Sequence, residues 1–571
     1  MDPARHLHAQ YRLANLGWTG VSCLLWPCLA AATLGLNTAP SAHAAASASP
    51  SAAATPAAAA PSAATPTPTP QAPAGPPIYI SEYRVLGAHE LPKLEIEEAV
   101  YPFLGPGRNT ADIEQARAAL EKAYQSQGFQ AASVEVPQQT GKGGIIILKV
   151  SEGKLGALRV KGARYFLPSA VKAMARSLAE GKVVNFNAIT RDLIALNQNP
   201  DRQVTPTLRA GLEPGTVDID LTVQDKFPLH GSVELNNRYS ADTKPLRLNL
   251  SVNYSNLWQL GHTIGFSAQI APEAPDQVKV LSGYYIARVP NLDWLSLMLQ
   301  GTKQDSNVST VSSAAVAGRG NVVGGRLLFT LPPGKDFYQS LSAGMDYKHF
   351  DQNIVVGATT ILTPITYYPF SAAYNASWIN KKAVTEFNAD LVFHFRGMGS
   401  NLQEFENSRF KADGSFIYLR GDLSHTHELS AGFQLYGKVQ GQVSDQPLIN
   451  SEQFGGGGLG TARGYLEAEA LGDNAVFGAL ELRSPSLLSR WSNSGKNEWR
   501  VYAFGDAGLL TLNDPLPEQT SEFKLASIGV GSHLRLFGHL NGSIDAGIPL
   551  ISQPNTQAYH PLFTFRVWAD F

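Results

Sequence analysis

The sequence predicts two α+β modules followed by an all-β transmembrane barrel of about sixteen antiparallel strands. A β-α-α-β-β order of elements occupies residues 78–153 and recurs over 154–226. From Leu229 to the end, helical periodicity gives way to segments in which apolar and polar residues alternate. The final segment, 561–571, places the two kinds of residue on opposite faces most completely. Together these three observations favour a membrane barrel preceded by two small domains.

The composition supports a chain with several domains and much β-structure. Its 571 residues are too many for one ordinary core. Charged residues make up 16 %, below the roughly 25 % typical of soluble domains. The formal net charge is −2, so charge does not suggest a nucleic-acid partner. The many Gly, Tyr and Phe residues suit β-strands that are joined by tight turns.

The first 44 residues are expected to be a secretory signal peptide. A basic start precedes an apolar run over 21–36, and small residues occupy Ala42 and Ala44, where a signal peptidase reads. A membrane anchor is the alternative. Cleavage after Ala44 would remove both cysteines of the chain, so the mature protein would need no disulfide. Residues 45–77 are almost entirely Ala, Pro, Ser and Thr, which is typical of a linker.

Turn and capping residues place the elements of the two modules. The first module is predicted to contain a strand at 78–86, helices at 91–104 and 109–127, and strands at 132–136 and 145–150. The second is predicted to contain a strand at 158–162, a helix from Pro168, a helix capped by Asn187, and strands at 204–210 and 217–223. A repeat of about 70–75 residues indicates duplication of one module. Coincidence between two small domains is the alternative.

The barrel strands follow one another with turn residues between them. The predicted strands are 229–240, 246–257, 262–273, 278–290, 292–305, 318–333, 337–351, 361–379, 383–397, 408–426, 427–444, 474–487, 498–513, 522–537, 539–551 and 561–571. Single-chain bacterial barrels prefer an even number of strands. An outer-membrane barrel alternates because its outer face meets lipid and its lumen is wet. In the last strand the face expected to meet lipid carries Phe563, Phe565, Val567, Ala569 and Phe571.

One loop and one strand stand out as candidate functional residues. The loop at 451–473 carries a run of glycines and then Arg463, Gly464 and Tyr465. The freedom of the glycines would allow it to enter a narrow lumen. A phosphate-binding loop is disfavoured, because neither a helix nor a lysine follows. The alternative is that Arg463 is a solvated loop residue.

A later strand contains an acid that could receive the arginine. Its motif is Phe504-Gly505-Asp506-Ala507-Gly508. Strand parity places Phe504, Asp506 and Gly508 on one face, expected to be the lumen, together with Glu481 on the preceding strand. The histidines are scattered, and His425 and His427 are interpreted as hairpin residues rather than metal ligands. No catalytic set, cofactor site or metal site is predicted.

The two modules, the barrel, the Arg-Gly-Tyr loop and the Phe-x-Asp-x-Gly strand resemble one family. It is the two-partner secretion transporters (TpsB; ShlB/FhaC/HecB-like haemolysin secretion/activation proteins), which belong with BamA in one superfamily. The resemblance covers about residues 78–571. The modules look like POTRA domains, and residues 196–202, 212–215 and 227–237 are similar to the second POTRA domain and to the barrel entry of these transporters.

The resemblance implies function, location and partners. It implies that Arg463 folds back into the barrel and pairs with Asp506. It also implies export of a large haemolysin or filamentous adhesin from periplasm to cell surface, with the exoprotein captured by the POTRA domains through β-augmentation. Outer-membrane lipid, lipopolysaccharide and the barrel assembly machinery are further expected partners. Many members place a plug helix before the first POTRA domain, where this chain has its Ala/Pro-rich segment.

Three other functions are compatible with a barrel. The first is an outer-membrane assembly factor of the BamA type, which shares the architecture. The second is a passive porin, but a diffusion pore needs no domain that captures a substrate. The third is a barrel enzyme, which the missing catalytic set disfavours.

Overall fold

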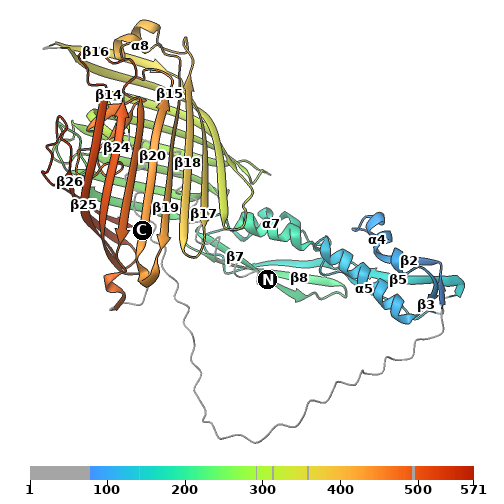
Figure 1. Ribbon diagram of the computed structural model, residues 1–571. Coiled ribbons are helices and arrows are strands. Elements are labelled where there is room, and N and C mark those ends of the chain that lie inside the picture. The colour runs from blue at the N-terminus through green and yellow to red at the C-terminus, as the bar shows by residue number, and fades with distance from the viewer. Residues whose placement is uncertain (1–77, 140–141, 291, 312–313, 357–358, 491–495) are drawn as a thin grey trace, which may run out of the picture. The chain divides into compact units, whose positions relative to one another are not determined.

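The computed structural model describes residues 78–139, 142–290, 292–311, 314–356, 359–490 and 496–571 (Figure 1). The predicted signal peptide and linker lie outside the described residues. So does any helix that would plug the barrel from the N-terminal side. The described chain divides into two compact units, with the boundary between Phe227 and Pro228. None of the described helices is both long enough and apolar enough to cross a membrane.

The first module of the N-terminal unit has the predicted order of elements plus one further strand. Its elements are β1 (Ile78–Ile80), β2 (Glu82–Leu86), α4 (Lys93–Val100), η1 (Tyr101–Phe103), β3 (Gly105–Arg108), α5 (Thr110–Ser126), β4 (Ser133–Glu135), η2 (Lys142–Gly144) and β5 (Ile145–Ser151). The main sheet has the order β2-β5-β4, and β1 pairs separately with β3. The sequence does not predict β3, because a Gly-Pro-Gly run has the composition of a turn.

Helix α5 shows why the local sequence forms this module. Asn109 accepts hydrogen bonds from the backbone N–H of Ala111 and Asp112, and the Asp112 carboxylate accepts the N–H of Asn109 in return. The helix ends before Gly128, whose φ of +95° suits a left-handed C-terminal residue. Its buried face carries Ile113, Ala116, Leu120 and Tyr124. The predicted cap, end and apolar face are therefore confirmed.

The second module repeats the arrangement with a different cap. Its elements are β6 (Lys154–Lys161), α6 (Pro168–Met174), η3 (Arg176–Leu178), α7 (Phe186–Leu196), β7 (Arg202–Ala210) and β8 (Thr216–Asp225), with the sheet order β6-β8-β7. The prediction that Asn187 caps α7 is wrong. Asn185 accepts the N–H of Ala188, whereas Asn187 lies in the first turn. Asn185 also donates to the carbonyl of Gln127 in the first module, so a contact between modules selects the cap.

Matching contacts in both modules support their repetition. Gly87 and Gly162 each follow a first strand with φ near +80°. A Cβ there would lie 2.4 Å from the carbonyl oxygen of Val150 in the first module and 2.5 Å from that of Val223 in the second. Such a separation leaves room only for glycine. The same backbone crossing is therefore built twice.

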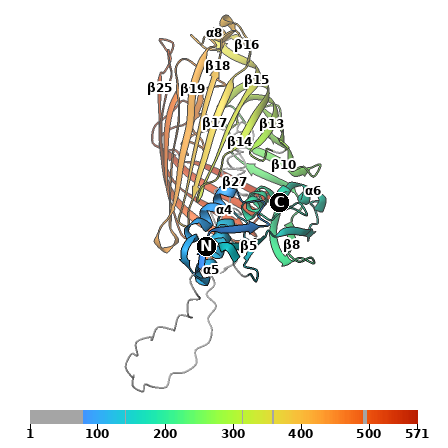
Figure 2. The same cartoon turned by 90° about the vertical axis from the view of Figure 1, so that its right-hand side faces the viewer.

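The second unit is a closed antiparallel barrel (Figures 1 and 2). Its strands are β9 (Leu229–Asn236), β10 (Arg247–Leu257), β11 (His262–Ile270), β12 (Val278–Arg288), β13 (Leu295–Val311), β14 (Ala314–Thr330), β15 (Phe337–Val356), β16 (Thr359–Tyr367), β17 (Phe370–Ile379), β18 (Ala383–His394), β19 (Phe416–Glu428), β20 (Gln434–Ser444), β23 (Asn474–Arg483), β24 (Glu498–Thr511), β25 (Glu522–Leu536), β26 (Leu540–Pro549) and β27 (Leu562–Asp570). Strands β16 and β17 both pair with β15, one after the other along its length. They therefore share one position in the ring, which has sixteen positions. The predicted strand number is confirmed.

One predicted strand begins too early. The sequence predicts a strand over 408–426, but helix α8 (Leu402–Ser408) ends at the first of these residues and β19 starts at Phe416. A capping box between Asn401 and Glu404 begins this helix, and Phe405 buries against the barrel interior. The periplasmic-end turns include the short helices η4 (Ser430–Gly432) and η5 (Leu487–Arg490).

The two faces of the last strand differ as predicted. Phe563 and Phe571 are 62 % and 64 % exposed on the outer face, and Phe565 is partly exposed. On the inner face Arg566 and Trp568 are buried. The pattern fits an apolar exterior that meets lipid and a polar interior.

Candidate functional site

The loop between β20 and β23 lies inside the barrel rather than outside it. Two short strands, β21 (Phe454–Gly456) and β22 (Ala470–Gly472), pair to form a hairpin within the loop. Most of the residues between Ser451 and Tyr465 are buried. Their partners are inward-facing residues of the barrel strands. The loop therefore occupies the lumen.

Arg463 makes a dense set of contacts with acids of the barrel wall. Its Nε donates to Oδ2 of Asp506 at 2.7 Å and its Nη2 to Oδ1 at 2.7 Å, which is a bidentate pair. Its backbone N–H donates to the same carboxylate at 3.0 Å, and its Nη1 donates to Glu481 at 2.6 Å. Arg463 and Asp506 are 7 % and 4 % exposed. The structure thus brings together the arginine and both predicted acids.

The ring of Phe504 completes the arginine pocket. The guanidinium carbon lies 3.6 Å from the centre of this ring, close enough for a cation–π contact. Glu481 is held in turn by Arg483, whose Nε and Nη2 donate at 2.8 and 2.6 Å. Two cations and two acids therefore alternate in the order Asp506, Arg463, Glu481 and Arg483, with Arg463 supplied by the loop and the other three by β23 and β24. The buried charges compensate one another, which burial requires.

Gly464 and Tyr465 extend the contact to β25 and β26. A Cβ on Gly464 would lie 3.0 Å from the carbonyl group of Gly547, so the two backbones touch. The φ of Gly464 is +92°, which also favours glycine. The hydroxyl of Tyr465 donates to the carbonyl oxygens of Ala526 and Ile551 at 3.0 and 2.8 Å. All three residues of the motif are therefore fixed to the barrel wall.

Gly508 makes space for an aromatic pair beneath the loop. A Cβ on Gly508 would lie 2.0 Å from the ring of Phe477, which stacks on Phe454 of the loop. The second glycine of the strand motif therefore admits a ring that supports the loop.

Two glycines of the run are required by close approach as well as by conformation. Gly457 and Gly458 have φ of +106° and +80°. A Cβ on Gly457 would lie 2.3 Å from the carbonyl oxygen of Leu466, and one on Gly458 the same distance from the carboxylate of Glu467. The sequence attributes these glycines to flexibility alone, whereas the structure uses them for a tight fold.

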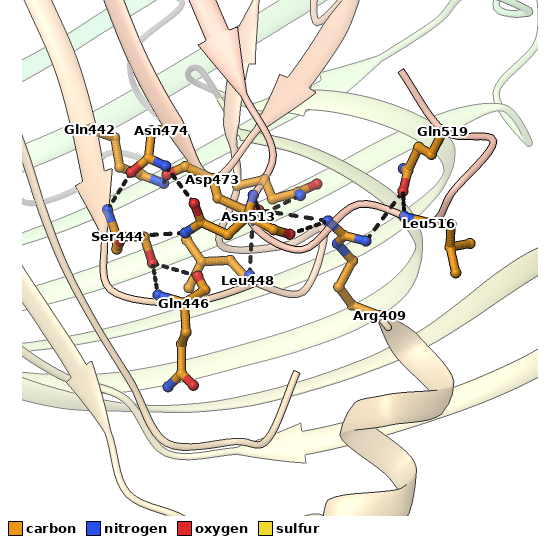
Figure 3. A network of polar contacts seen from close by, with 11 residues as sticks. Arg409, Gln442, Ser444, Gln446, Leu448, Asp473, Asn474, Asn513, Leu516 and Gln519 are labelled. Atoms are coloured by element: carbon orange, nitrogen blue, oxygen red, sulfur yellow. Dashed lines mark hydrogen bonds and ion pairs between the residues drawn. The ribbon is translucent and has the colours of Figure 1, made fainter. Parts of the chain in front are cut away.

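A network around Asp473 closes the base of the loop (Figure 3). The Asp473 carboxylate accepts the backbone N–H groups of Leu448 and Asn513 at 2.9 and 2.8 Å. It also accepts the side chain of Gln453 at 3.0 Å, and Nη2 of Arg409 lies 3.7 Å away. The network joins the start and end of the loop to the segments that precede β19 and follow β24.

Sequence reasoning missed three acids that also contact the loop or belong to it. Asp545 on β26 lies 3.9 Å from Arg463 and accepts the hydroxyl of Tyr502 at 2.7 Å. Glu467 accepts Arg238 Nε at 2.6 Å, and Glu452 accepts one lysine and two tyrosines. Strand parity predicts that Asp545 points into the lumen, but no sequence motif marks any of the three acids.

The histidine pair lies on the barrel wall, away from these contacts. The rings of His425 and His427 stack with centroids 5.9 Å apart, and Nδ1 of His425 is hydrogen-bonded to the hydroxyl of Thr385. Among the residues that the structure describes, no group of three or more potential ligands is arranged to hold a metal.

Known proteins match both units of the chain. The profile of the ShlB-type POTRA domain matches residues 78–153, and that of the haemolysin secretion/activation protein ShlB/FhaC/HecB matches 215–534, more than half of the chain. The outer membrane transporter CdiB of Escherichia coli is 24 % identical over 507 residues, covering 85 % of this chain and 81 % of the relative. The heme/hemopexin transporter protein HuxB of Haemophilus influenzae is 20 % identical over 477 residues, covering 82 % of each.

Solved structures match the architecture. CdiB from Escherichia coli superposes with a TM-score of 0.62 at 21 % identity, covering 88 % of this chain and 93 % of that one. BamA from Haemophilus ducreyi, lacking POTRA domains 1–3, gives 0.53 at 14 % identity, covering 86 % of this chain and 100 % of that one. At these identities the likeness establishes the fold. With the profile match over more than half of its length, the chain belongs to the ShlB/FhaC/HecB family of haemolysin secretion/activation proteins, outer-membrane transporters with periplasmic POTRA domains that secrete a partner exoprotein.

Proposed function

We propose that this chain exports one large exoprotein of the haemolysin or filamentous-adhesin type, and that the Arg463 loop gates its passage. The observation that carries the proposal is the seating of Arg463 on Asp506 and Glu481 inside the lumen. A loop held there by a buried, bidentate pair obstructs the lumen until that pair is released. Export therefore requires the loop to move out of the lumen.

Two POTRA domains, at 78–153 and 154–226, would capture the exoprotein in the periplasm. Their sheets end in edge strands, β2 and β4 in the first and β6 and β7 in the second. An extended segment can add to such an edge through backbone hydrogen bonds. Strand β7 contains Pro206, which has no N–H to offer, and the start of β6 is already bonded at Leu155 to Gly181 and Lys182.

The rest of the chain is assigned to targeting and anchorage. Residues 1–44 would direct export to the periplasm, 45–77 would form a spacer, and 227–571 would form the barrel. Lipid and lipopolysaccharide would surround the apolar outer face, and the barrel assembly machinery would insert it. The chain is proposed to act without catalysis, since the relatives that it matches are transporters by name.

Deleting the gene and comparing the cell-surface and secreted proteins tests this function. Loss of one exoprotein, with other outer-membrane proteins unchanged in amount, is the expected result. Loss of many outer-membrane proteins would instead establish an assembly factor of the BamA type. Complementation with the intact gene should restore the missing exoprotein and serves as the control.

A further inference from the structure

The loop that carries Arg463 is attached to the barrel at a second place, which no sequence motif marks. Glu452 lies eleven residues before Arg463 and is 1 % exposed. Its Oε1 accepts Lys348 Nζ at 2.6 Å and the hydroxyl of Tyr367 at 2.5 Å. Its Oε2 accepts the hydroxyl of Tyr418 at 2.7 Å. Four polar groups thus meet in a buried cluster.

The partners of Glu452 come from a different part of the barrel than those of Arg463. Lys348, Tyr367 and Tyr418 belong to β15, β16 and β19. Asp506 and Glu481 belong to β24 and β23. The loop therefore bridges two sectors of the wall, with one charged anchor on each.

Apolar packing divides the loop in the same way. Leu448 and Ile449 insert into a cluster with residues of β14, β15, β16, β18, β19 and α8. Phe454 and Tyr465 belong to a separate cluster with residues of β23, β24 and β25. The two clusters share no residue, so each limb of the loop has its own core.

The backbone at Glu452 is held as well. Its carbonyl oxygen accepts the side chains of Arg420 and Gln442 at 3.3 and 3.2 Å. The hydroxyl of the preceding Ser451 is hydrogen-bonded to that of Tyr367 at 2.8 Å. A carboxylate with this many buried partners positions the limb from Leu448 to Glu452 and leaves the Arg463 limb to its own contacts.

We propose that Glu452 is a positioning residue and forms, with Lys348, Tyr367 and Tyr418, a second anchor that releases independently of Arg463. Release of this anchor alone frees the upstream limb and widens one side of the lumen while Arg463 stays seated. The proposal rests on the gating role of the loop given above. It adds a partly open state in which the barrel holds one limb and not the other.

Two reporter cysteines distinguish the anchors, because both native cysteines lie before residue 45. Ile449→Cys reports on the upstream limb and Ala462→Cys on the Arg463 limb, and both positions are fully buried. Cysteine suits them because it behaves as a small apolar residue. The measurement is the labelling rate of each cysteine by a membrane-impermeant maleimide on intact cells.

Glu452→Gln should raise labelling of Ile449→Cys about tenfold or more, since it removes a charge-assisted set of hydrogen bonds. Labelling of Ala462→Cys should change less than about twofold, within the spread for independent sites. Arg463→Ala should give the reverse pattern. Tyr418→Phe removes a single bond and should give a smaller rise at Ile449→Cys, which guards against a variant that fails to assemble.

Glu469→Gln is the matched control, because Glu469 is a buried acid of the same loop whose partners, Asn555 and Thr556, are neutral and lie elsewhere. It should leave the Ile449→Cys rate unchanged. Equal acceleration at both reporters in Glu452→Gln, or none at Ile449→Cys, would overturn the second anchor. Either outcome leaves the gating role itself to be decided by export in the Arg463 variant.

Discussion

At the scale of single residues, the Phe-x-Asp-x-Gly strand has a separate task for each inward position. Phe504 covers the guanidinium of Arg463, Asp506 pairs with it, and Gly508 admits the ring of Phe477. Alternate residues of a strand share a face, so the period of two brings all three beneath one loop.

Asp506→Asn should unseat the loop more than Glu481→Gln does. Asp506 accepts three hydrogen bonds from Arg463, whereas Glu481 accepts one and is shared with Arg483. Removing one partner of a buried pair costs ~3–5 kcal/mol, because the other charge stays buried. Labelling of Ala462→Cys should therefore rise more in Asp506→Asn. The opposite ranking would contradict the assignment of the main contact.

Gly508→Ala should displace the aromatic support of the loop. The new Cβ would overlap the ring of Phe477, and overpacking of this kind costs ~1–3 kcal/mol. We expect a lower thermal midpoint of the barrel, measured by its heat-modifiable electrophoretic mobility. Phe477→Leu in the same chain should recover part of the loss. Gly301→Ala is the control, since a Cβ at Gly301 meets no atom within 4 Å. An unchanged midpoint in Gly508→Ala would contradict the packing.

Much of this site could be predicted, and the missing part has a clear cause. The motif and strand parity together predict that Arg463 meets Asp506 and that Glu481 points inward. Asp545 and Glu452 were missed because their contacts depend on which distant strands face the loop across the lumen. Strand parity predicts which face of the sheet a side chain occupies, but it does not predict which residues lie across the lumen from that side chain.

At the scale of elements, each periplasmic module carries, at the end of its last strand or directly after it, a carboxylate that holds a loop. Glu152 accepts the N–H groups of His89 and Glu90 and the hydroxyl of Tyr124. Asp225 accepts three successive N–H groups, from Arg164 to Phe166. Glu152 and Asp225 each stand two residues after a buried valine, Val150 or Val223, and thus have the same role in the two modules.

The first module should lose stability at high pH. Burial raises the pKa of Tyr83 to about 12, and burial together with the Glu152 carboxylate raises the pKa of Tyr124. Because these folded values lie above the unfolded value of about 10, this stabilising contribution is complete below pH ~10 and is lost as the pH rises. Far-ultraviolet circular dichroism of the full chain should show helix loss above that pH.

Tyr124→Phe should make this pH dependence shallower, because it removes one titrating group. Tyr101→Phe is the control, since Tyr101 is mostly exposed. Helix content that stays constant while the ultraviolet absorbance shows the tyrosines ionising would contradict the prediction.

Element prediction succeeded where a local signal decides the structure. Asn109, Gly128 and Pro168 mark helix ends that the structure places as expected. It failed where a distant contact decides, as for Asn185, which also binds the first module, and for α8, whose Phe405 packs into a cluster with residues of β16 and β19.

At the scale of the whole molecule, the barrel closes where its first and last strands meet, along a short seam. The ladder between β9 and β27 runs over Arg566 to Asp570, with further backbone hydrogen bonds at Phe565 and Phe571, whereas β24 and β25 pair along all of β24. Inside the seam Arg566 donates to Glu234 from Nε and Nη2, each at 2.9 Å, and both side chains are 2 % exposed. Outside it, the ring of Phe571 lies over Gly231.

Glu234→Gln should therefore weaken the closed barrel. The change removes the bidentate partner of Arg566, at a cost of ~3–5 kcal/mol. A lower temperature for loss of the fast-migrating folded band in gel electrophoresis is the expected result. Replacing both Glu234 and Arg566 with methionine should recover much of the lost thermal stability, because no buried charge remains. Equal losses in the single and double variants would show that packing, not charge, holds the seam.

The sixteen-strand ring was predictable because alternation and turns recur in every strand. The loop inside the ring was not predictable in this way, because its residues do not alternate between apolar and polar. Only the motif resemblance indicated that this loop lies inside.

The loop seated by Arg463 is proposed to control export. Arg463→Ala, inserted in the outer membrane at the normal level, should secrete far less of the partner exoprotein than the natural chain. Its conductance in planar lipid bilayers should differ from that of the natural chain. Normal secretion together with unchanged conductance would contradict the claim.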